Sequence, residues 1–312
     1  MAFEVLLASP RGFCAGVERA IRTVELALEA HHGPVYVRHE IVHNRTVVED
    51  LRARGAVFVE DTAEIPAGAT AVFSAHGVSP EVRQEADARG LSMLDATCPL
   101  VSRVHAAVLR YAARGYTILF VGHTGHPEVE GVMGEAPGQV RLVETLQDAE
   151  NVQPPEPERV AYATQTTLSL DDVSAIVDTL RRRFPRMVGP DAGDMCYATQ
   201  NRQEAVRALV TRHGAEMVLV LGSPNSSNSN RLREVAELAG ARAYLLGSVA
   251  ELDPAWLNGA ARVGVTAGAS TPEHVVQRVV DRLRELGASD VRTVETRVED
   301  VYFAPPPIRL LA

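Results

Sequence analysis

Short runs of β-branched and other apolar residues alternate along the chain with longer stretches in which apolar residues recur every three or four positions. The short runs predict strands and the longer stretches predict helices. The expected strands are Glu4–Ser9, Val35–Arg38, Val57–Glu60, Ala71–Ser74, Thr117–Val121, Val140–Val143, Val160–Ala163, Met217–Leu221, Ala243–Leu246 and Arg262–Thr266. The clearest helices are Ala15–Ala30, Pro99–Ala113, Asp171–Phe184, Thr199–His213, Ser229–Ala239 and Thr271–Leu286. Their alternation from end to end predicts an α/β protein with mostly parallel strands.

Five of the expected strands run into turns of small, uncharged polar residues, at 74–77, 122–126, 164–167, 222–228 and 266–270. In open α/β sheets the ligand binds beyond the carboxyl ends of the strands, where helix N-termini present backbone N–H groups and partial positive charge. Helix capping explains any one of these turns equally well. The five together favour a shared pocket for a phosphate group.

Composition and charge narrow the chemistry. The 312 residues carry 31 basic and 40 acidic side chains, a net charge of −9, which argues against a nucleic-acid backbone as the partner. None of the basic residues is a lysine, so a Schiff base, a pyridoxal-phosphate anchor and a Walker-type phosphate loop are excluded. The N-terminal residues do not resemble a signal peptide, and no uncharged apolar run reaches the roughly 18 residues of a membrane span. We therefore expect a cytosolic protein that does not enter the membrane.

The three cysteines, Cys14, Cys98 and Cys196, are spaced by 84 and 98 residues, about a third of the chain each time. An odd number of cysteines does not make a disulfide framework. Each is expected at a turn that opens a helix, a position that favours the thiolate form that binds metals. The spacing predicts three α/β lobes, residues 14–97, 98–193 and 194–290, each contributing one thiolate to a common centre.

Residues 1–13 are expected to add a central strand, and 291–312, which include three prolines at 305–307, to form a C-terminal extended arm. Two polar segments rich in proline or glycine, 151–157 and 189–194, are typical of exposed connections.

The common centre formed by the three cysteines has three interpretations. A structural zinc ion normally has four ligands from close pairs such as C-x₂-C, which this chain lacks. A cubane iron–sulfur cluster held by three cysteines leaves one iron open to substrate. Three unrelated buried thiols remain the alternative.

Nine motifs follow one another along essentially the whole chain: Pro10–Val17, Val37–Asn44, Phe73–Val78, Asp95–Val101, Gly125–Gly131, Thr164–Ser169, Cys196–Thr199, Asn225–Arg231 and Val265–Ser270. Together they resemble the LytB family, the 4-hydroxy-3-methylbut-2-enyl diphosphate reductases. The resemblance implies a trefoil of three α/β lobes around a central iron–sulfur cluster. It also implies a two-electron reductive dehydroxylation that yields isopentenyl and dimethylallyl diphosphates, the last step of the non-mevalonate route to isoprenoids.

The resemblance also implies roles for individual residues. Cys14, Cys98 and Cys196 would hold one 4Fe–4S cluster with an open iron. Glu128 would supply the proton, and Thr166 would relay it and contact the substrate hydroxyl. The residues around the diphosphate would be His43, His76, His126, Ser226, Ser227, Asn228 and Ser270. The external electron donor would be a ferredoxin or a flavodoxin.

The residue types suit this chemistry. Loss of an allylic hydroxyl requires a proton as the C–O bond breaks, and a buried carboxyl such as Glu128 can supply it. The alternative for Glu128 is a solvated residue at a helix start. A histidine beside a diphosphate can carry positive charge where lysine is absent. The remaining histidines are interpreted as surface or helix residues; they include His31, His32, His105, His213 and His274.

Two arginine features are set aside as substrate or partner sites. Arg11 is excluded as a phosphate ligand because it can instead pair with a structural carboxylate. The run 181–183 is interpreted as the solvated end of a helix rather than as a docking site for an acidic electron carrier.

Two other functions stay open at this point. One is a non-redox iron–sulfur dehydratase acting on a phosphorylated small molecule, in which the open iron serves only as a Lewis acid. The other is a cluster-bearing redox sensor with no need for Glu128. No G-x-G-x-x-G motif opens a helix after an expected strand, so electrons for a reductase must come from outside the chain.

Overall fold

The computed structural model describes residues 2–31, 33–168, 170–190 and 196–307. Within it the chain forms two compact units, each assembled from segments that are distant in sequence. The first unit comprises Met1–Glu18, Val42–Asp50 and Tyr197–Tyr302, and the second comprises Arg19–Ile41, Leu51–Cys196 and Phe303–Ala312. Parts of the predictions lie outside the described residues, namely His32, Ser169, 191–194 of the second connection and 308–312 of the arm.

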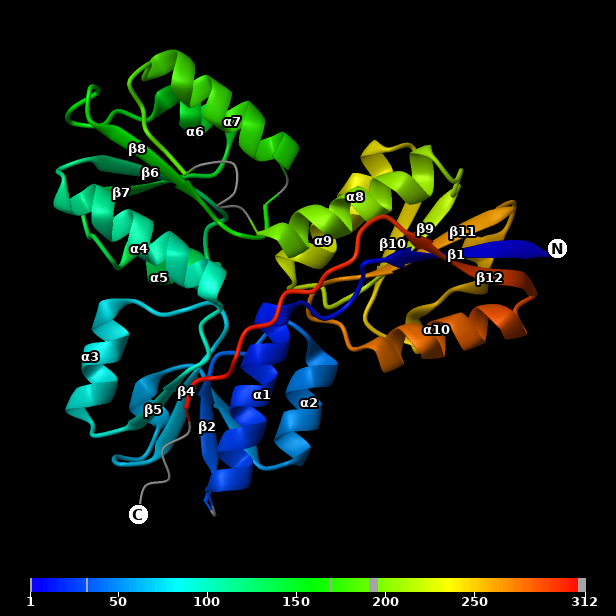
Figure 1. Ribbon diagram of the computed structural model, residues 1–312, viewed down its shortest axis with the longest axis horizontal. Helices are drawn as coiled ribbons and strands as arrows, with labels where there is room; N and C mark the ends of the chain where they lie inside the picture. The colour runs from blue at the N-terminus through cyan, green and yellow to red at the C-terminus, as the bar shows by residue number, and fades with distance from the viewer. Residues whose placement is uncertain (1, 32, 169, 191–195, 308–312) are drawn as a thin grey trace. The chain divides into compact units, whose positions relative to one another are not determined.

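The strands form three sheets in which every pairing is parallel. They are β1 (Phe3–Ser9), β2 (Val35–Arg38), β3 (Ala56–Val59), β4 (Thr70–Phe73), β5 (Ser92–Asp95), β6 (Thr117–Val121), β7 (Val140–Val143), β8 (Val160–Thr164), β9 (Met217–Leu221), β10 (Arg242–Leu246), β11 (Arg262–Ala267) and β12 (Ala288–Glu295). The predicted α/β class with parallel sheets is confirmed (Figure 1).

Helices connect these strands, as parallel pairing requires. They are α1 (Ala15–Ala30), α2 (Arg45–Ala53), α3 (Pro80–Ala88), α4 (Pro99–Ala113), α5 (Pro127–Met133), α6 (Leu146–Asn151), α7 (Leu170–Arg183), α8 (Tyr197–Thr211), α9 (Ser227–Leu238) and α10 (Glu273–Glu285). Short 3₁₀ turns are η1 (Thr62–Glu64), η3 (Val249–Glu251) and η4 (Pro254–Leu257). No helix in the described part of the chain has both the length and the apolar character needed to cross a membrane.

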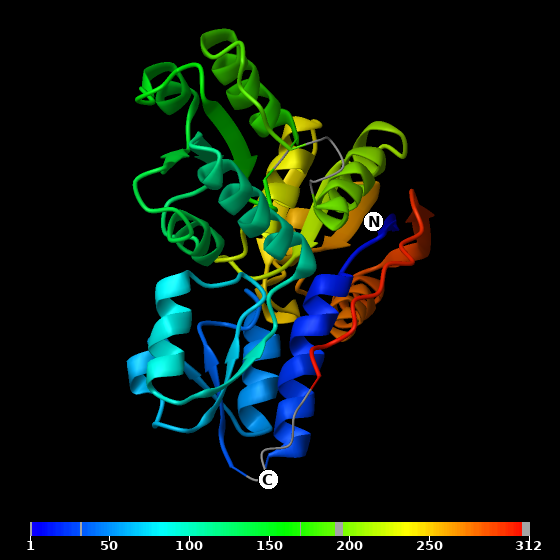
Figure 2. The same cartoon turned by 60° about the vertical axis from the view of Figure 1, so that its left-hand side comes forward.

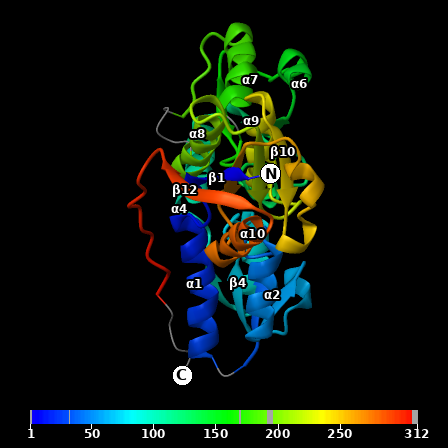
Figure 3. The same ribbon diagram turned by 90° about the vertical axis from the view of Figure 1, so that its right-hand side faces the viewer.

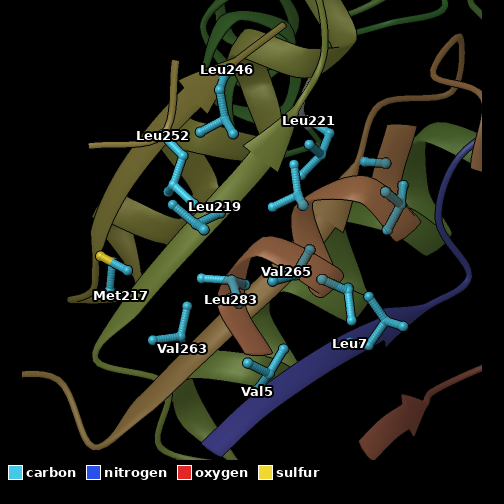
Figure 4. Close-up of a cluster of buried hydrophobic side chains, with 14 of the residues drawn as sticks. Val5, Leu7, Met217, Leu219, Leu221, Leu246, Leu252, Val263, Val265 and Leu283 are labelled. Carbon is cyan, nitrogen blue, oxygen red and sulfur yellow. The ribbon is translucent and has the colours of Figure 1, made fainter. Parts of the chain in front are cut away.

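The sheet of the first unit has the order β10-β9-β11-β1-β12 and is covered on both faces. Strand β9 is buried along its whole length, so its successive side chains enter two separate cores. Leu219 packs with Leu283 of α10 in one core, as Figure 4 shows. Val218 packs with Leu232 of α9 in the other. A continuous apolar run in the sequence therefore becomes a central strand between two helical layers.

Strand β1 lies inside this sheet, between two strands from the far end of the chain. Val5 is in register with Val263 of β11 on one side and with Val291 of β12 on the other. Figure 3 shows β1 and β12 next to each other. Residues 288–295 are therefore a strand, and the predicted extended arm, residues 291–312, begins inside it.

The second unit contains two smaller sheets, with the orders β3-β2-β4-β5 and β7-β6-β8 (Figures 1 and 2). Strand β6 is buried throughout and again serves two cores. Leu119 packs with Leu180 of α7, and Phe120 packs with Val108 of α4. Strands β2–β5 come from the predicted lobe 14–97, β6–β8 from 98–193 and β9–β11 from 194–290, and each of these sets lies in a different sheet. The division into three lobes around a shared centre stays a prediction.

Prolines determine where three helices of the second unit begin. Pro80, Pro99 and Pro127 occupy the first turn of α3, α4 and α5, where a missing backbone N–H costs no hydrogen bond. A proline at this place makes the residue before it the N-cap. In α4 and α5 those N-cap residues are Cys98 and His126, both predicted site residues.

Candidate functional site

Each of the three cysteines lies where a helix begins. Cys14 directly precedes α1, Cys98 is the N-cap of α4 and Cys196 directly precedes α8. The carbonyl oxygens of Cys14 and Cys98 accept backbone hydrogen bonds from Glu18 and Ser102, both at 2.9 Å. None of the three forms a disulfide, and each is half-buried. Cys14 belongs to the first unit, and the other two belong to the second.

Two of the cysteine loops are held against predicted polar turns of their own unit. In the first unit, the Cys14 N–H donates to the carbonyl oxygen of Ala269 at 3.3 Å. In the second unit, the Cys98 N–H donates to the carbonyl oxygen of Ala75 at 3.0 Å. Each of these cysteines is thus tied through its backbone to a turn that contains a residue predicted to contact the diphosphate, Ser270 in one case and His76 in the other.

The first unit holds five of the predicted diphosphate residues: His43, Ser226, Ser227, Asn228 and Ser270. The four on the turns after β9 and β11 come together because these two strands are parallel neighbours and end at the same edge. His43 joins them from a different part of the chain. The Ser270 hydroxyl donates to the His43 carbonyl oxygen at 3.0 Å.

Further hydrogen bonds explain why the segment carrying His43 docks here. The backbone N–H of Arg45, at the start of α2, donates to the hydroxyl of Ser223 at 3.0 Å. The Asn44 amide donates to the hydroxyl of Thr271 at 3.4 Å, while its oxygen caps α2 by accepting from the Val47 N–H at 3.2 Å. These partners of the segment follow β9 and β11, so α2 begins at the carboxyl edge of the large sheet.

Asn228, in the first turn of α9, is 6% exposed. Among the described residues, neither its Nδ2 nor its Oδ1 has a hydrogen-bond partner. Buried side-chain amides are normally paired, because an unpaired one loses its bonds to water without compensation. Next to it, the Ser229 hydroxyl fills the space that a Cβ at Gly222 or Gly268 would need, 2.1 Å away in each case. The amide of Asn228 is thus an unmet hydrogen-bonding group at the edge where a phosphate is expected.

Glu128 and Thr166 meet in the second unit. Glu128, on α5 after β6, is 1% exposed. Its carboxylate accepts two hydrogen bonds from Thr166 after β8, from the backbone N–H at 2.8 Å and from the hydroxyl at 2.9 Å. Burial raises the pKa of the Glu128 carboxyl from its ordinary 4.5 to about 7, although both bonds from Thr166 favour the charged form. The solvated position considered for Glu128 is therefore wrong.

His76 and His126 lie near each other in the same unit, with ring centroids 5.6 Å apart and ring planes at 89°. The Nδ1 of His126 caps α5 by accepting from the Glu128 N–H at 3.1 Å. A ring nitrogen that accepts carries no proton, so the neutral ring of His126 has its proton on Nε2. While it caps the helix, His126 can serve a ligand as a neutral donor and not as a cation. His76 Nδ1 lies 3.2 Å from the hydroxyl of Ser74.

Gln165 was not singled out from the sequence, although it lies inside the motif that contains Thr166. It is 1% exposed, and its Oε1 accepts from the His123 N–H at 3.0 Å while its Nε2 donates to the Thr167 hydroxyl at 2.9 Å. This side chain links the turns after β6 and β8, which carry Glu128 and Thr166. Its place inside the polar turn 164–167, directly before Thr166, was the available signal.

His105 lies in α4, which agrees with the interpretation as a surface or helix residue, but its side chain is buried. Its Nδ1 is 2.6 Å from the carboxylate of Glu135. Its ring also occupies the space beside Gly77 and Gly131, within 3.0 and 3.2 Å of a Cβ built at these positions. His105 therefore packs between the turn of His76 and helix α5. A single histidine on a helical pattern carries no sequence signal for such a role.

Arg11 forms the kind of contact that was the reason to exclude it as a phosphate ligand, with its Nη2 2.6 Å from the Glu273 carboxylate. Arg183 is less solvated than the helix-end interpretation of 181–183 suggests. It donates to the carbonyl oxygens of Ala149 and Val152 at 2.6 and 2.8 Å, at the end of α6.

The donor set for a metal is limited. Within the described ranges, no group of three or more His, Cys, Asp or Glu side chains is arranged to hold a single metal ion. Thiolates are the ligands that iron–sulfur clusters use, and the three cysteines, each at a helix start, stay the predicted ligands of such a cluster.

The chain is similar to known proteins over nearly its whole length. A family model described as "LytB protein" matches residues 5–284. A protein from Bordetella pertussis (strain Tohama I) is 59% identical over 303 residues, which cover 97% of this chain and 93% of that protein. A protein from Azoarcus sp. (strain BH72) is 57% identical, with coverages of 97% and 96%. Both relatives are named 4-hydroxy-3-methylbut-2-enyl diphosphate reductase.

Two solved structures are also similar. The E-1-hydroxy-2-methyl-but-2-enyl-4-diphosphate reductase of Plasmodium falciparum superposes with a TM-score of 0.94 at 38% identity, and covers 98% of this chain and 96% of its own. A second structure, described as (E)-4-hydroxy-3-methyl-but-2-enyl diphosphate reductase, the terminal enzyme of the non-mevalonate pathway, has a TM-score of 0.64 at 33% identity. Its coverages are 91% of this chain and 99% of its own.

Proposed function

Because the chain belongs to the LytB family, we propose that it catalyses the reaction for which its relatives are named, the reduction of 4-hydroxy-3-methylbut-2-enyl diphosphate at the end of the non-mevalonate pathway. The enzyme is an oxidoreductase, as the sequence predicts. The alternatives, a non-redox dehydratase and a redox sensor, are not favoured, since the relatives are named as reductases over nearly the full length of the chain.

The reaction requires two electrons and two protons. The allylic C–O bond breaks, the oxygen leaves as water after accepting one proton, and the allylic carbon framework takes the electron pair and the second proton. The product is the isopentenyl or the dimethylallyl diphosphate, depending on which carbon is protonated. The chain must therefore hold a source of electrons, a proton donor and a binding site for the diphosphate.

Membership in the family implies an iron–sulfur cofactor. We assign Cys14, Cys98 and Cys196 as the ligands of one 4Fe–4S cluster, supported by their half-buried positions at three helix starts. When bound, such a cluster supplies electrons and an open iron site that acts as a Lewis acid. The electrons come from outside, since the sequence has no nicotinamide or flavin motif, and we propose a ferredoxin or flavodoxin as the donor.

We assign the role of proton donor to Glu128. This assignment depends most directly on the burial of its carboxyl group. Its carboxyl is buried, with a pKa of about 7, so near neutral pH it is protonated about half of the time. A general acid is most effective when its pKa is close to the working pH. The hydroxyl of Thr166, 2.9 Å from the carboxylate, can pass the proton on to a substrate hydroxyl beside it.

The diphosphate is assigned to polar turns that follow parallel strands. In the first unit these residues are His43, Ser226, Ser227, Asn228 and Ser270, and in the second they are His76 and His126. The support is the unmet amide of Asn228 and the proton on Nε2 of His126 that its cap requires. Neutral donors of this kind bind a charged phosphate without the desolvation of a lysine ammonium group.

The proposal is tested by anaerobic purification, counting of iron and sulfide, and assay of the allylic diphosphate with a low-potential dye. We expect iron and acid-labile sulfide in the purified chain and no turnover when the reductant is withheld. Turnover without reductant would support the dehydratase instead. An active chain free of iron would contradict the reductase.

The role of Glu128 has its own test. Glu128→Gln should keep the cluster and lower kcat by about 100-fold to 10,000-fold, the usual range for loss of a general acid. Glu130→Gln is the matched control, because Glu130 lies on the same helix and is exposed. A Glu128→Gln variant with full activity in the cell would favour the sensor. Thr166→Ser should retain activity, since it preserves the hydroxyl.

A further inference from the structure

Arg202, on helix α8, is completely buried. A guanidinium group has five N–H donors, and a buried one needs an acceptor for each of them. Nε and one Nη2 hydrogen bond go to the carbonyl oxygen of Gly12, at 3.0 and 2.9 Å. A second Nη2 bond reaches the carbonyl oxygen of Phe13 at 3.1 Å. The Nη1 atom donates to the Ala198 carbonyl and to the Glu299 carboxylate, each at 3.0 Å.

Two of these acceptors belong to the loop that carries Cys14. Gly12 and Phe13 directly precede this cysteine, and Gly12 has a φ of +66°, a conformation that turns its backbone away from the path of β1. On its other side the loop donates from Gly12 N–H to Ala267 at 3.2 Å. The loop is therefore held from two sides, by the end of β11 and by the guanidinium group of Arg202.

A third acceptor belongs to the helix that follows Cys196. Ala198 is in the first turn of α8, which begins one residue after this cysteine. The fourth acceptor, Glu299, comes from the segment after β12 and also accepts from the Asn201 amide at 2.9 Å. A single side chain thus connects the loop before one predicted cluster ligand, the first helical turn after another, and the C-terminal part of the first unit.

We propose that Arg202 and Glu299 are positioning residues for the cluster. They hold the Cys14 loop to the start of α8, so that the cysteine at each of these two places keeps the backbone geometry that the cluster requires. The proposal rests on the assignment of Cys14 and Cys196 as ligands made above. Neither Arg202 nor Glu299 is assigned a contact with the substrate or with the reacting atoms.

The shape of the side chain explains why an arginine is needed. Its planar fork addresses three carbonyl groups and a carboxylate at once, whereas a lysine ammonium is a point charge with three donors. Arg202→Lys keeps the charge and leaves part of the loop unheld. Glu299→Gln keeps the size and an acceptor oxygen but leaves the buried guanidinium without its counter-charge.

The experiment compares the loaded wild-type protein with Arg202→Lys and Glu299→Gln, all purified anaerobically. It measures iron and sulfide per chain and the rate at which a chelator removes the iron. Residues that orient metal ligands typically change metal affinity about 10-fold to 100-fold when substituted. We expect faster iron release by a factor in this range from both variants, with thermal unfolding of the cluster-free chains recorded alongside.

Two controls separate positioning from general destabilisation. Val279→Ala opens a cavity under α10 in the same unit, where Val279 is fully buried, without touching the arginine contacts. Glu285→Gln removes the carboxylate of an exposed ion pair with Arg282. We expect both controls to release iron at the wild-type rate, although Val279→Ala lowers the melting temperature.

The outcomes are distinguishable. If Glu299→Gln releases iron no faster than the controls, the positioning role is overturned. The positioning role is also overturned if Glu299→Gln and Val279→Ala lower the melting temperature equally and release iron at the same rate. Should Arg202→Lys fail to fold, Glu299→Gln carries the decision. A wild-type chain that takes up no iron and sulfide would instead overturn the proposed function, and this inference with it.

Discussion

Glu128 shows how burial of one side chain makes stability depend on pH. In the folded protein its pKa is about 7, compared with 4.5 in an exposed state. Between these values the folded chain keeps a proton that the unfolded chain releases, so the free energy of unfolding falls as the pH rises from 4.5 to 7. The rise of the pKa from 4.5 to about 7 corresponds to about 3 kcal/mol of stability, which is fully lost above pH 7.

Glu128→Gln should therefore be more stabilising at high pH than at low pH. Near pH 5 the two proteins should melt at similar temperatures, because the parent carboxyl is protonated and resembles the amide. Near pH 8 the variant should be the more stable by about 3 kcal/mol, since the parent buries a charge. Thermal melts at both pH values measure this difference. A parent and variant with parallel pH profiles would contradict the raised pKa.

Asn228 is predicted to destabilise the ligand-free protein and to strengthen binding of the diphosphate. Its buried amide has no partner among the described residues, so Asn228→Leu should raise the melting temperature of the ligand-free protein. The same change should raise KM for the diphosphate about 10-fold to 100-fold, the loss expected for a hydrogen bond to a charged group. Binding and melting measurements on one preparation test both effects.

Asn230, two residues after Asn228 in the same turn of α9, provides the contrast. Its Nδ2 donates to the carbonyl oxygens of Pro224 and Ser226 at 2.7 and 3.0 Å. Asn230→Leu should therefore lower the melting temperature. If both leucine variants destabilise the ligand-free protein equally, the amide of Asn228 is satisfied within the protein and its assignment to the diphosphate loses its main support.

At the scale of elements, the close approach of α9 to the ends of β9 and β11 makes a sharp steric prediction. A Cβ at Gly268 would meet the Ser229 hydroxyl at 2.1 Å but the Ser229 Cβ only at 3.2 Å. A Cβ at Gly222 would meet the same two atoms at 2.1 and 2.5 Å. Gly268→Ala and Gly222→Ala should each destabilise the protein by about 1–3 kcal/mol through overpacking.

Ser229→Ala should rescue one of these variants and not the other. Without the hydroxyl, the methyl group at position 268 has room after a small shift, whereas the methyl group at position 222 still collides with the Cβ of residue 229. Unfolding measurements on the single and double variants give the coupling energy directly. Equal rescue of both glycine variants would show that α9 is not seated between the two strands as described.

Long periodic or fully apolar runs are the elements whose prediction has a clear physical reason. The boundaries of the helices α1 and α4 and of the fully buried strands β6 and β9 agree with the structure, because such runs have few alternatives. The boundaries of β2 and β7 agree as well, although each is a short, partly exposed strand that contains an arginine. The strands β5 and β12 were not predicted. Only Val291 and Val294 give β12 an apolar pattern, since it is an edge strand that pairs with β1 alone and faces solvent along most of its length.

At the scale of the whole molecule, strand order limits what can be predicted about the site. The sequence indicated the polar turns after the strands, but it did not predict which strands are neighbours in a sheet. The contact of the His43 segment with Ser270, and that of Glu128 with Thr166, depend on which strands and loops are adjacent. Arg202 and His105 were missed because a polar residue in a helical pattern normally faces solvent.

In the first unit, β1 from the start of the chain pairs with β12 from near its end. We therefore expect opposite results for two truncations. A chain ending at Gly287 lacks β12, which leaves β1 at the sheet edge and removes Glu299. We expect a loss of more than about 5 kcal/mol, enough to unfold a typical domain. A chain ending at Tyr302 keeps both features and should remain folded, as circular dichroism and melting would show. A folded Gly287 truncation would contradict the requirement for β12 beside β1 and for Glu299.

The position of β1 also has a consequence for the synthesis of the chain on the ribosome. Strand β1 is translated some 250 residues before both of its neighbours, β11 and β12. At about 5–20 residues per second, this strand waits on the order of 12 to 50 s for its partners. During that interval the Cys14 loop lacks Arg202, Ala267 and Ala269, the residues that hold it in the folded chain. The cluster proposed at Cys14 can therefore be bound only after β11 and α8, which hold this loop, have been made.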